Sequence, residues 1–451
     1  MLMQPAARSP LLRVPVALAV ASLLMMMSVT SCSPHLATTP DKAPDSTPGI
    51  TPQTRFGSSI GFIDDQLVVT LAPGANAAAL AAAYGATLVS VVQGVAVLQL
   101  AAPGDIEDVQ LQIRNDGRVL TSERNSLVIP AEVRQKSWSF DDGFGSAATT
   151  AGQPVMMSLG MVQAHALVAG EASKVAVLDT GIDPTHPLVG PRILGGWDFI
   201  DNDADPTDVA TGLDVNGDGV PDGAYGHGTH VAGIVMLTAP NAKLLVGRVL
   251  DADGRGDVRT VAAGIRWATA SGAKVINMSL GMLRPSNAIA FAIHEATLRG
   301  VVCVASAGNQ GSNSPVEYPA SSSEVIAVAA DDAYNRPASF TSYGPFVSIC
   351  APGVNIRSAF PGGGYRIWSG TSMSAPFVSG TVAMLKSMHP EWGLNDMTLQ
   401  LRYNARRLVD VSPAQVGQLG AGALNIADVM RSLLVTPSLE DRTAGDIQIN
   451  P

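Results

Sequence analysis

The sequence predicts an α/β protein built on a doubly wound, mostly parallel sheet with helices on both of its faces. Two observations predict this architecture for residues 156–432. Short apolar runs recur along that part of the chain, namely VAVLD, KLLVGRVL, KVINMSL, VVCVASA and VIAVAA. Segments with helical periodicity, such as residues 258–271 and 288–299, separate some of these runs. Strands that are apolar throughout and alternate with helices are typical of a parallel sheet buried on both faces.

A smaller pattern precedes this region, in residues 61–131. The strand-like segments QLVVTLA, ATLVSVV, VAVLQLA and NSLVIPA combine with helical patterns over residues 76–84 and 105–114 in the order βαββαβ. This order predicts a small ferredoxin-like α+β domain, a fold that hosts many functions. Residues 132–155 contain Gly, Ser and Asp without periodicity, which predicts an exposed connector between the two domains.

The first residues predict an export signal. Arg8 and Arg13 precede an apolar run over residues 14–27, which is short for a membrane span and typical of a signal peptide. We place the signal peptide in residues 1–31. It ends in Val-Thr-Ser followed by Cys32, which resembles the lipobox of bacterial lipoproteins, where the cysteine is lipidated and becomes the new N-terminus. An ordinary secretory leader with a chance cysteine is the alternative.

Two further segments flank the predicted domains. Residues 32–60 are rich in Pro, Thr, Ser and Ala and have no apolar period, so we expect a flexible tether. With a lipid on Cys32, the protein would be exported and held by its anchor at the cell envelope, at the outer membrane if the organism has one. The C-terminal tail over residues 433–451 is short and polar and predicts nothing further.

Composition limits the partners of the protein. The chain has 451 residues, of which 46% are hydrophobic, and this favours a large folded core over disorder. Its formal net charge at pH 7 is −10, so nothing favours nucleic acid as a partner. Cys303 and Cys350 lie in apolar runs, where a thiol behaves as a small hydrophobic group. We expect no catalytic role for either, and the sequence alone leaves a disulfide between them open.

Four polar residues stand just past predicted strands or at the start of predicted helices. Asp179 ends the run VAVLD, and Asn309 follows the strand in VVCVASAGN. His227 in GHGTHVAG and Ser372 in SGTSMSAP each begin a helical pattern. Ser372 could simply be a helix N-cap. As a nucleophile it would instead need a base, an orienting acid and an oxyanion donor, and the other three residues are of those types.

Five segments carry a family resemblance: VAVLDTGID, GHGTHVAG, VINMSLG, ASAGN and SGTSMSAP. Each is similar to a signature segment of the subtilisin-like serine peptidases, and they stand in that family's order. The resemblance implies a serine endopeptidase that cleaves proteins or peptides through an acyl-enzyme and needs no cofactor for catalysis. It implies a nucleophile, a general base, an acid that orients the base and an oxyanion donor, which would be Ser372, His227, Asp179 and Asn309 respectively.

The resemblance also implies where a substrate binds. One segment would pair with an extended peptide as a sheet edge, and it consists of Ser279, Leu280 and Gly281. Another would line the pocket for the residue before the scissile bond, and it consists of Ser306, Ala307 and Gly308. Glu317 lies where the family tends to place the floor of that pocket. If it faces inward, its carboxylate favours Lys or Arg in the substrate, and if it faces solvent, a broad apolar preference is expected.

By the same resemblance, the segment over residues 61–131 is similar to the inhibitory chaperone prodomain of such enzymes. We expect the enzyme to cut its own connector within residues 132–155. Since the predicted lipid lies on the prodomain side, the cut would release the protease from the membrane into the extracellular space. The alternative is a latent or inactive binding scaffold of the same fold at the cell envelope.

One insertion has the pattern of a calcium loop. Side-chain oxygens alternate there around a turn glycine, as calcium loops require, at Asp214, Asn216, Asp218 and Asp222. Tyr225 replaces the bidentate acid expected at the twelfth position. The loop is therefore either a partial, structural calcium site or a solvated turn.

Overall fold

The computed structural model describes residues 61–101, 106–130 and 139–435. They belong to one compact unit, in which a small α+β module over residues 61–130 precedes a large α/β domain. The predicted signal peptide, Cys32, the tether and the tail beyond residue 435 lie outside the described residues.

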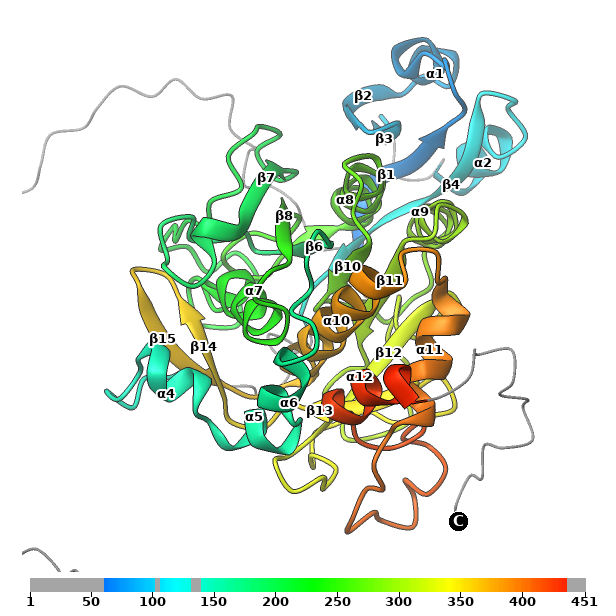
Figure 1. The fold of residues 1–451 in the computed structure, drawn as a ribbon. Coiled ribbons are helices and arrows are strands. Elements are labelled where there is room, and N and C mark those ends of the chain that lie inside the picture. Colours follow the sequence, from blue (N-terminus) through cyan, green and yellow to red (C-terminus); the bar gives the residue numbers. More distant parts are fainter. Residues whose placement is uncertain (1–60, 102–105, 131–138, 436–451) are drawn as a thin grey trace, which may run out of the picture. The chain divides into compact units, whose positions relative to one another are not determined.

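A parallel sheet of seven strands forms the centre of the large domain (Figure 1). Every neighbouring pair of strands in it is parallel. In spatial order the strands are β13 (Ile349–Pro352), β12 (Val325–Asp331), β11 (Val302–Ser306), β10 (Val275–Met278), β6 (Lys174–Asp179), β8 (Lys243–Arg248) and β7 (Ile193–Asp198). The chain builds outward from β6 in both directions, so the sheet is doubly wound, as predicted.

The central strands of the sheet consist mainly of apolar residues because both of their faces are covered. Successive residues of β10 belong to two different cores, Val275 to one and Ile276 to the other. The same alternation separates Val302 and Val304 from Cys303 in β11. Since the side chains of a strand point alternately to opposite faces, two buried faces require a continuous apolar run.

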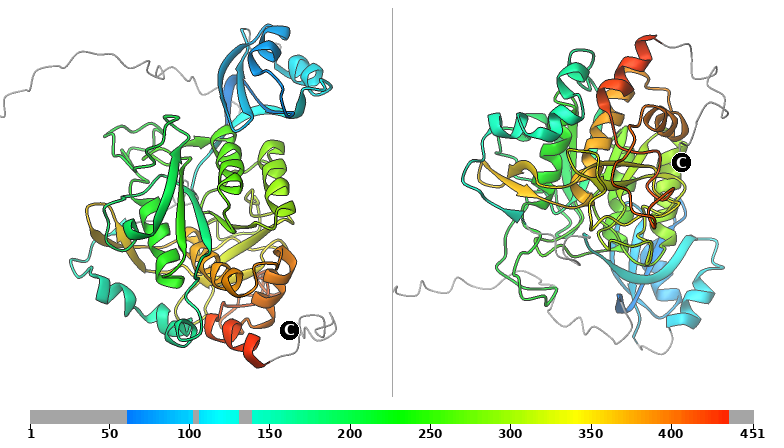
Figure 2. Two further views of the ribbon diagram at one scale, coloured as in Figure 1. Left: turned by 45° about the horizontal axis from the view of Figure 1, so that its top comes forward. Right: turned by 90° about the horizontal axis from the view of Figure 1, so that it is seen from below.

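Helices cover the two faces of the sheet (Figures 1 and 2). In one core lie α7 (His227–Thr238) and α10 (Thr371–Met388), and in the other α8 (Val258–Ala270) and α9 (Asn287–Leu298). The helices α8 and α9 confirm the two helices predicted from periodicity. The first core also contains residues of α5 (Pro154–Ser158), α6 (Met161–His165), α11 (Leu394–Tyr403) and α12 (Ile426–Val435).

The N-terminal module has the predicted βαββαβ order. Its elements are β1 (Phe62–Leu71), α1 (Ala77–Ala83), β2 (Thr87–Val92), β3 (Val95–Gln99), α2 (Ile106–Ile113) and β4 (Val119–Val128). The strands are antiparallel in the spatial order β2-β3-β1-β4. Leu67, Leu80 and Ile113 are fully buried in a core that belongs to the module alone.

β4 joins the module to the large domain. Its last residues pair with the short strand β9 (Gly256–Asp257). Glu123 of β4 accepts hydrogen bonds from the first two backbone N–H groups of α9 and from the hydroxyl of Ser286, which caps that helix. A carboxylate at this end of a helix satisfies unpaired N–H groups and is favoured by the helix dipole. The module therefore docks through a charge-assisted contact as well as through strand pairing.

Residues 139–155, which the sequence predicts to be an aperiodic connector, contain secondary structure. β5 (Ser139–Phe140) pairs with β15 (Gly364–Trp368), which pairs in turn with β14 (Ile356–Phe360). The helix α4 (Ala147–Ala151) follows, and α5 begins at Pro154. A strand of two residues and helices of five are too short to display a period, which is why the sequence pattern does not predict them.

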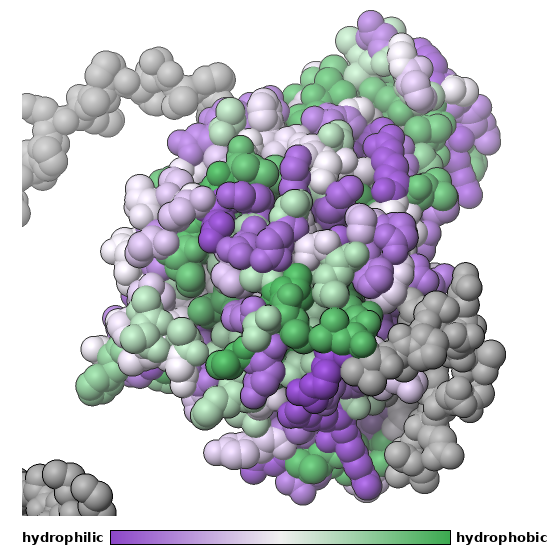
Figure 3. All heavy atoms as spheres, in the orientation of Figure 1, coloured by the Kyte–Doolittle hydropathy of each residue, from purple (hydrophilic) through white to green (hydrophobic). Residues whose placement is uncertain are grey.

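Hydrophilic and hydrophobic residues are intermingled on the face of the molecule in Figure 3. Within residues 61–101, 106–130 and 139–435, no helix has both the length and the apolar character that a membrane span needs.

The two cysteines of the large domain are buried free thiols, which answers the question of a disulfide between them. Burial raises the pKa of Cys303 to about 12, and it also raises the pKa of Cys350. A thiol that stays protonated at neutral pH is a poor nucleophile, so both behave as the small hydrophobic groups that the sequence suggests.

Candidate active site

An aspartate and a histidine meet where β6 ends and α7 begins. Oδ1 of Asp179 lies 2.7 Å from Nδ1 of His227 and accepts a second hydrogen bond from the backbone N–H of Thr180 at 2.8 Å. Asp179 is 1% exposed and His227 is fully buried. Because a carboxylate only accepts hydrogen bonds, Nδ1 of the neutral ring carries the hydrogen and Nε2 carries the lone pair. The imidazole is thus oriented to accept a proton at Nε2.

Trp368, which sequence reasoning misses, holds the imidazole ring from another side. Its ring meets that of His227 edge-to-face, with centroids 5.3 Å apart. It also lies edge-to-face with His230, at 5.7 Å. Trp368 ends β15 and stands four positions before Ser372. Its place next to the SGTS segment is the signal that could have found it.

Ser372 is the second residue of α10 and is fully buried in the full-length chain. Its hydroxyl donates to the carbonyl of Ser279 at 3.2 Å, and the hydroxyl of Ser279 donates to the carbonyl of Ser372 at 2.9 Å. Pro376 explains the second bond, because its nitrogen has no hydrogen to offer to the carbonyl four residues earlier. The predicted nucleophile and the predicted substrate edge are therefore joined by two reciprocal hydrogen bonds.

The side chain of Asn309 is oriented by the start of α10. Its Oδ1 accepts hydrogen bonds from the backbone N–H and from the hydroxyl of Thr371, both at 2.9 Å. With Oδ1 turned to Thr371, the amide presents its donor Nδ2 on the opposite side. An amide donor next to the N-terminus of a helix can stabilise negative charge on an oxygen.

The predicted substrate edge is paired in the full-length chain. Ile129, which follows β4, and Gly281 exchange two backbone hydrogen bonds of 3.1 Å in an antiparallel bridge. The next residue, Met282, forms a similar bridge with Tyr318, with both hydrogen bonds at 2.8 Å. Gly281, the last residue of the edge segment, thus contacts the end of the N-terminal module. Met282, which follows it, contacts the segment that carries Glu317.

Glu317 faces the interior, which settles one of the alternatives that the sequence leaves open. It is 1% exposed, and its Oε1 accepts a hydrogen bond from Nε2 of Gln310. Gly308 packs directly against it, because a Cβ on Gly308 would lie 2.5 Å from Cγ of Glu317. Ser306 and Ala307 lead up to Gly308 at the end of β11 and are buried. The predicted pocket wall and Glu317 are therefore neighbours.

The four predicted calcium ligands do not converge. Among the residues that the structure describes, no group of three or more His, Cys, Asp and Glu side chains could hold a metal ion. Both oxygens of Asp222 accept hydrogen bonds from residues 211–212, and those of Asp214 accept from the backbone of residues 217–219. The predicted set therefore does not fit a calcium ion as it stands, because its carboxylates are turned to separate backbone donors.

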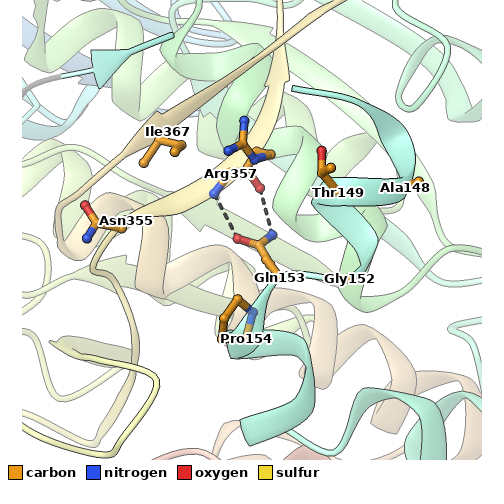
Figure 4. A pocket seen from close by; sticks show the side chains of 8 residues that line it. All are labelled: Ala148, Thr149, Gly152, Gln153, Pro154, Asn355, Arg357 and Ile367. Atoms are coloured by element: carbon orange, nitrogen blue, oxygen red, sulfur yellow. Dashed lines mark hydrogen bonds between the residues drawn. The ribbon is translucent and has the colours of Figure 1, made fainter. Parts of the chain in front are cut away.

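A separate hollow of about 570 Å³ lies between the α4–α5 segment and the β14–β15 hairpin (Figure 4). The side-chain amide of Gln153 donates to the carbonyl of Arg357 and accepts from its backbone N–H, both at 2.9 Å. Arg357 also forms an ion pair with Asp142. The lining contains none of the predicted catalytic or substrate-binding residues. These contacts fasten residues 142–153 to the large domain.

Two family models match the chain. One, described as the subtilase family, matches residues 170–422, which is more than half of the chain and contains Asp179, His227, Asn309 and Ser372. The other, described as the open reading frame 2 N-terminal domain, matches residues 53–128 and so overlaps the N-terminal module.

Individual relatives agree with the first match. Subtilisin BL of Lederbergia lenta is 38% identical over 286 residues, which cover 60% of this chain and 97% of that protein. Thermitase of Thermoactinomyces vulgaris is 40% identical over 235 residues, which cover 50% of this chain and 78% of that protein. The crystal structure of fervidolysin from Fervidobacterium pennivorans, described as a keratinolytic enzyme related to subtilisin, superposes with a TM-score of 0.67 at 25% identity. That superposition covers 83% of this chain but only 62% of fervidolysin.

Proposed function

This chain belongs to the subtilase family and is a serine endopeptidase, and on that premise we propose that Ser372, His227 and Asp179 are its catalytic triad. The observation that carries the proposal is the 2.7 Å hydrogen bond between Asp179 and His227. It joins an acid to a base on α7, which packs in the same core as α10, where Ser372 lies. The alternative of an inactive binding scaffold is not favoured, because the relatives of this chain are peptidases and all three side chains of the proposed triad are present.

Peptide hydrolysis would proceed in two stages. In the first, Oγ of Ser372 attacks the carbonyl carbon of the scissile bond while Nε2 of His227 takes the hydroxyl proton. His227 passes that proton to the leaving amine, and the acyl group stays on Ser372 as an ester. In the second, a water molecule gives a proton to His227 and attacks the ester, and His227 returns the proton to Oγ as the acid leaves. Asp179 keeps the ring in the required tautomer and stabilises the imidazolium.

Both stages place negative charge on the substrate's carbonyl oxygen. We assign Nδ2 of Asn309 and the backbone N–H of Ser372 as its hydrogen-bond donors. The contact of Asn309 with Thr371 supports this assignment. It holds Oδ1 against Thr371, so Nδ2 points to the opposite side of the amide group. The positive end of α10 adds to the stabilisation. A side-chain donor of this kind typically accounts for about 10²–10³ in kcat.

A sulfonyl fluoride tests the assignment of the nucleophile. Phenylmethylsulfonyl fluoride is expected to inactivate the enzyme and to sulfonylate Ser372 with release of fluoride, because the triad activates only that hydroxyl. Peptide mass spectrometry of the labelled protein locates the adduct. Ser374, two positions further along α10 and equally buried, is the internal control. Label on Ser374, or full activity after Ser372 is labelled, would contradict the assignment.

We also propose that Glu317 gives the enzyme a preference for Lys or Arg before the scissile bond. The contact with Gly308 supports this, because it puts the carboxylate against the wall of the predicted pocket. Gln310 donates to Oε1 and accepts from the hydroxyl of Ser342 through its own amide oxygen, so its orientation is fixed as a donor to Glu317. A substrate cation in the pocket would form a charge-assisted hydrogen bond with this carboxylate.

The variant Glu317→Gln is expected to lower kcat/KM for substrates with Lys or Arg at that position about 10- to 100-fold, as the loss of one charge-assisted hydrogen bond implies. Substrates with Leu at the same position should be cleaved as before or faster. The measurement is a peptide series that differs only at this residue. Glu324→Gln is the control, since Glu324 is partly exposed and pairs with His294. If the ratio of kcat/KM for the Lys substrate to kcat/KM for the Leu substrate is the same in Glu317→Gln as in the wild type, the proposal is wrong.

We further propose that the N-terminal module is an intramolecular inhibitor that the enzyme removes. The bridge between Ile129 and Gly281 supports this, because it occupies the edge with which a substrate would pair. Ser139 pairs with Trp368, which contacts His227. Both ends of the segment between Ile129 and Ser139 are thus held close to the proposed triad.

The same bridge indicates where along the chain the cut falls. Gly281, the partner of Ile129, lies two positions after Ser279, which exchanges hydrogen bonds with Ser372. We therefore propose that the enzyme cuts the chain within the predicted connector over residues 132–155, which follows Ile129. Residues 131–138 lie outside the described residues.

Two proposals rest on the sequence alone. The lipid on Cys32 lies outside the described residues, so anchoring at the envelope and release after the cut stay proposals. Calcium binding by the loop of Asp214, Asn216, Asp218 and Asp222 also stays a proposal. It would require side chains that now accept hydrogen bonds from separate donors to turn toward one ion, and no step of the mechanism depends on it.

A further inference from the structure

Asp208 is a buried carboxylate beside the proposed triad, and the mechanism above does not use it. It is 5% exposed. Its Oδ2 accepts two hydrogen bonds of 2.8 Å, from the hydroxyl of Thr180 and from the backbone N–H of Gly226. Thr180 directly follows Asp179, and Gly226 directly precedes His227. One carboxylate oxygen is therefore bonded to the chain neighbours of both members of the acid–base pair.

Thr180 extends this connection. Its hydroxyl accepts a hydrogen bond from the backbone N–H of Gly228 at 3.0 Å while it donates to Asp208. The end of β6 and the start of α7 are very close here, because a Cβ on Gly228 would lie 2.1 Å from the carbonyl oxygen of Gly181. No side chain can act as a spacer at such a contact. Hydrogen bonds must set the distance between the two elements.

We propose that Asp208 is a positioning residue of the peptidase, whose carboxylate holds the end of β6 and the first turn of α7 at the spacing that keeps Asp179 bonded to His227. The inference rests on the proposed triad. Asp208 can serve in this way because its own backbone is fixed, with its N–H donating to the carbonyl of Ile182 at 3.1 Å. It also closes the base of the inserted loop over residues 209–225, which begins after Asp208 and returns at Gly226.

The charge of Asp208 changes in the pH range where such an enzyme works. Burial raises the pKa of Asp208 to about 7, the hydrogen bonds from Thr180 and Gly226 oppose this, and the charges of Asp179 and Arg248 act in opposite directions. Tyr225 is a further titratable group nearby, and its pKa is raised by burial and by the charge of Asp208. Above pH 7 Asp208 is a charged acceptor, and below it the neutral acid accepts more weakly. Protonation of Asp208 should therefore weaken the link between β6 and α7 as the pH falls.

The test compares the processed wild-type enzyme with Asp208→Asn, and Asp205→Asn is the matched control. Asp205 is exposed, lies three positions earlier and bonds within its own turn to Thr207. Asp208→Asn is expected to lower kcat about tenfold at pH 8 with little change in KM, because small displacements of catalytic groups are costly. Because Asp208→Asn removes this titrating carboxyl, the ratio of the wild-type kcat to the Asp208→Asn kcat should fall as the pH is lowered from about 8 to about 6, whereas the ratio of the wild-type kcat to the Asp205→Asn kcat should stay constant.

A ratio of wild-type to Asp208→Asn kcat that does not change with pH, or unchanged kcat in Asp208→Asn, overturns the positioning role. Neither result affects the triad, which is tested through Ser372. Since a buried amide can also destabilise the fold, a second pair of variants separates the two effects. Thr180→Val removes the bridging hydroxyl and should repeat the loss of kcat, whereas Thr180→Ser keeps the hydroxyl and should restore it. Equal kcat in this pair would overturn the proposal as well.

Discussion

Replacing Ser372 by alanine is expected to abolish peptide hydrolysis and to leave the chain uncut. Without Oγ no acyl-enzyme forms, and losing the serine of such a triad costs about 10⁶ in kcat. The fold should survive, because the substitution removes only a hydroxyl group. Its hydrogen-bond acceptor, the backbone carbonyl of Ser279, stays in place. Intact mass and membrane fractionation of both chains are the measurements. The wild type should yield a shorter, soluble product that begins within the connector over residues 132–155, and the variant should stay full length.

Ser374→Ala is the matched control for this experiment. It makes the same substitution on the same helix, at a serine that is equally buried and has no assigned role. It should process and hydrolyse peptides as the wild type does. If both Ser372→Ala and the wild type stay full length, removal of the module by the enzyme itself is wrong. If Ser372→Ala hydrolyses peptides, Ser372 is not the nucleophile.

Asp179→Asn is expected to lower kcat by about 10⁴ while the protein stays folded. Thr180 and His227 both bond to Oδ1, so an asparagine offers them either its oxygen, which lacks the charge that stabilises the imidazolium, or its Nδ2. Nδ2 is a donor, so in the second case the ring would have to present a lone pair at Nδ1 and carry its hydrogen on Nε2. That tautomer cannot take the proton of Ser372. Kinetics on peptide substrates and thermal unfolding of the same preparation are the measurements.

Asp183→Asn provides the comparison, since it lies in the same DTGID segment. Asp183 accepts hydrogen bonds from Thr185 and from the backbone of Gly362, and these hold a turn away from the imidazole. Its replacement should lower the temperature of unfolding and leave kcat near the wild-type value. If Asp183→Asn loses as much kcat as Asp179→Asn at equal stability, the proposed role of Asp179 as the orienting acid is wrong.

The sequence pattern predicts the elements whose burial is regular along their length. β10 and β11 read as strands because both of their faces meet a core, and α8 reads as a helix because only one of its faces does. β4 is longer than its apolar end suggests, starting at Val119 rather than at Asn125. Its early part is polar because those side chains reach outside the module, as Glu123 does to α9. A contact across a domain boundary cannot be recognised from local pattern.

The candidate site shows the same limit. Motifs place Asp179, His227 and Ser372 at the ends of their elements, where the structure has them. Asp208 lies 28 positions from its partner Thr180 and is followed by an inserted loop, so no spacing points to it. The inward direction of Glu317 depends on the glycine at 308, which leaves room for it. Partners that are distant along the chain become visible only in three dimensions.

The attachment of the N-terminal module through β4, β9 and the start of α9 has a consequence for how latency ends. While the chain is intact, the contact is intramolecular, and its effective concentration of about a millimolar does not change with dilution. After the proposed cut the same contact becomes an ordinary bimolecular equilibrium. Inhibition would then persist where the two fragments are concentrated, as at the envelope, and would be lost once they are diluted. The local concentration of the fragments would therefore control the activity of the enzyme.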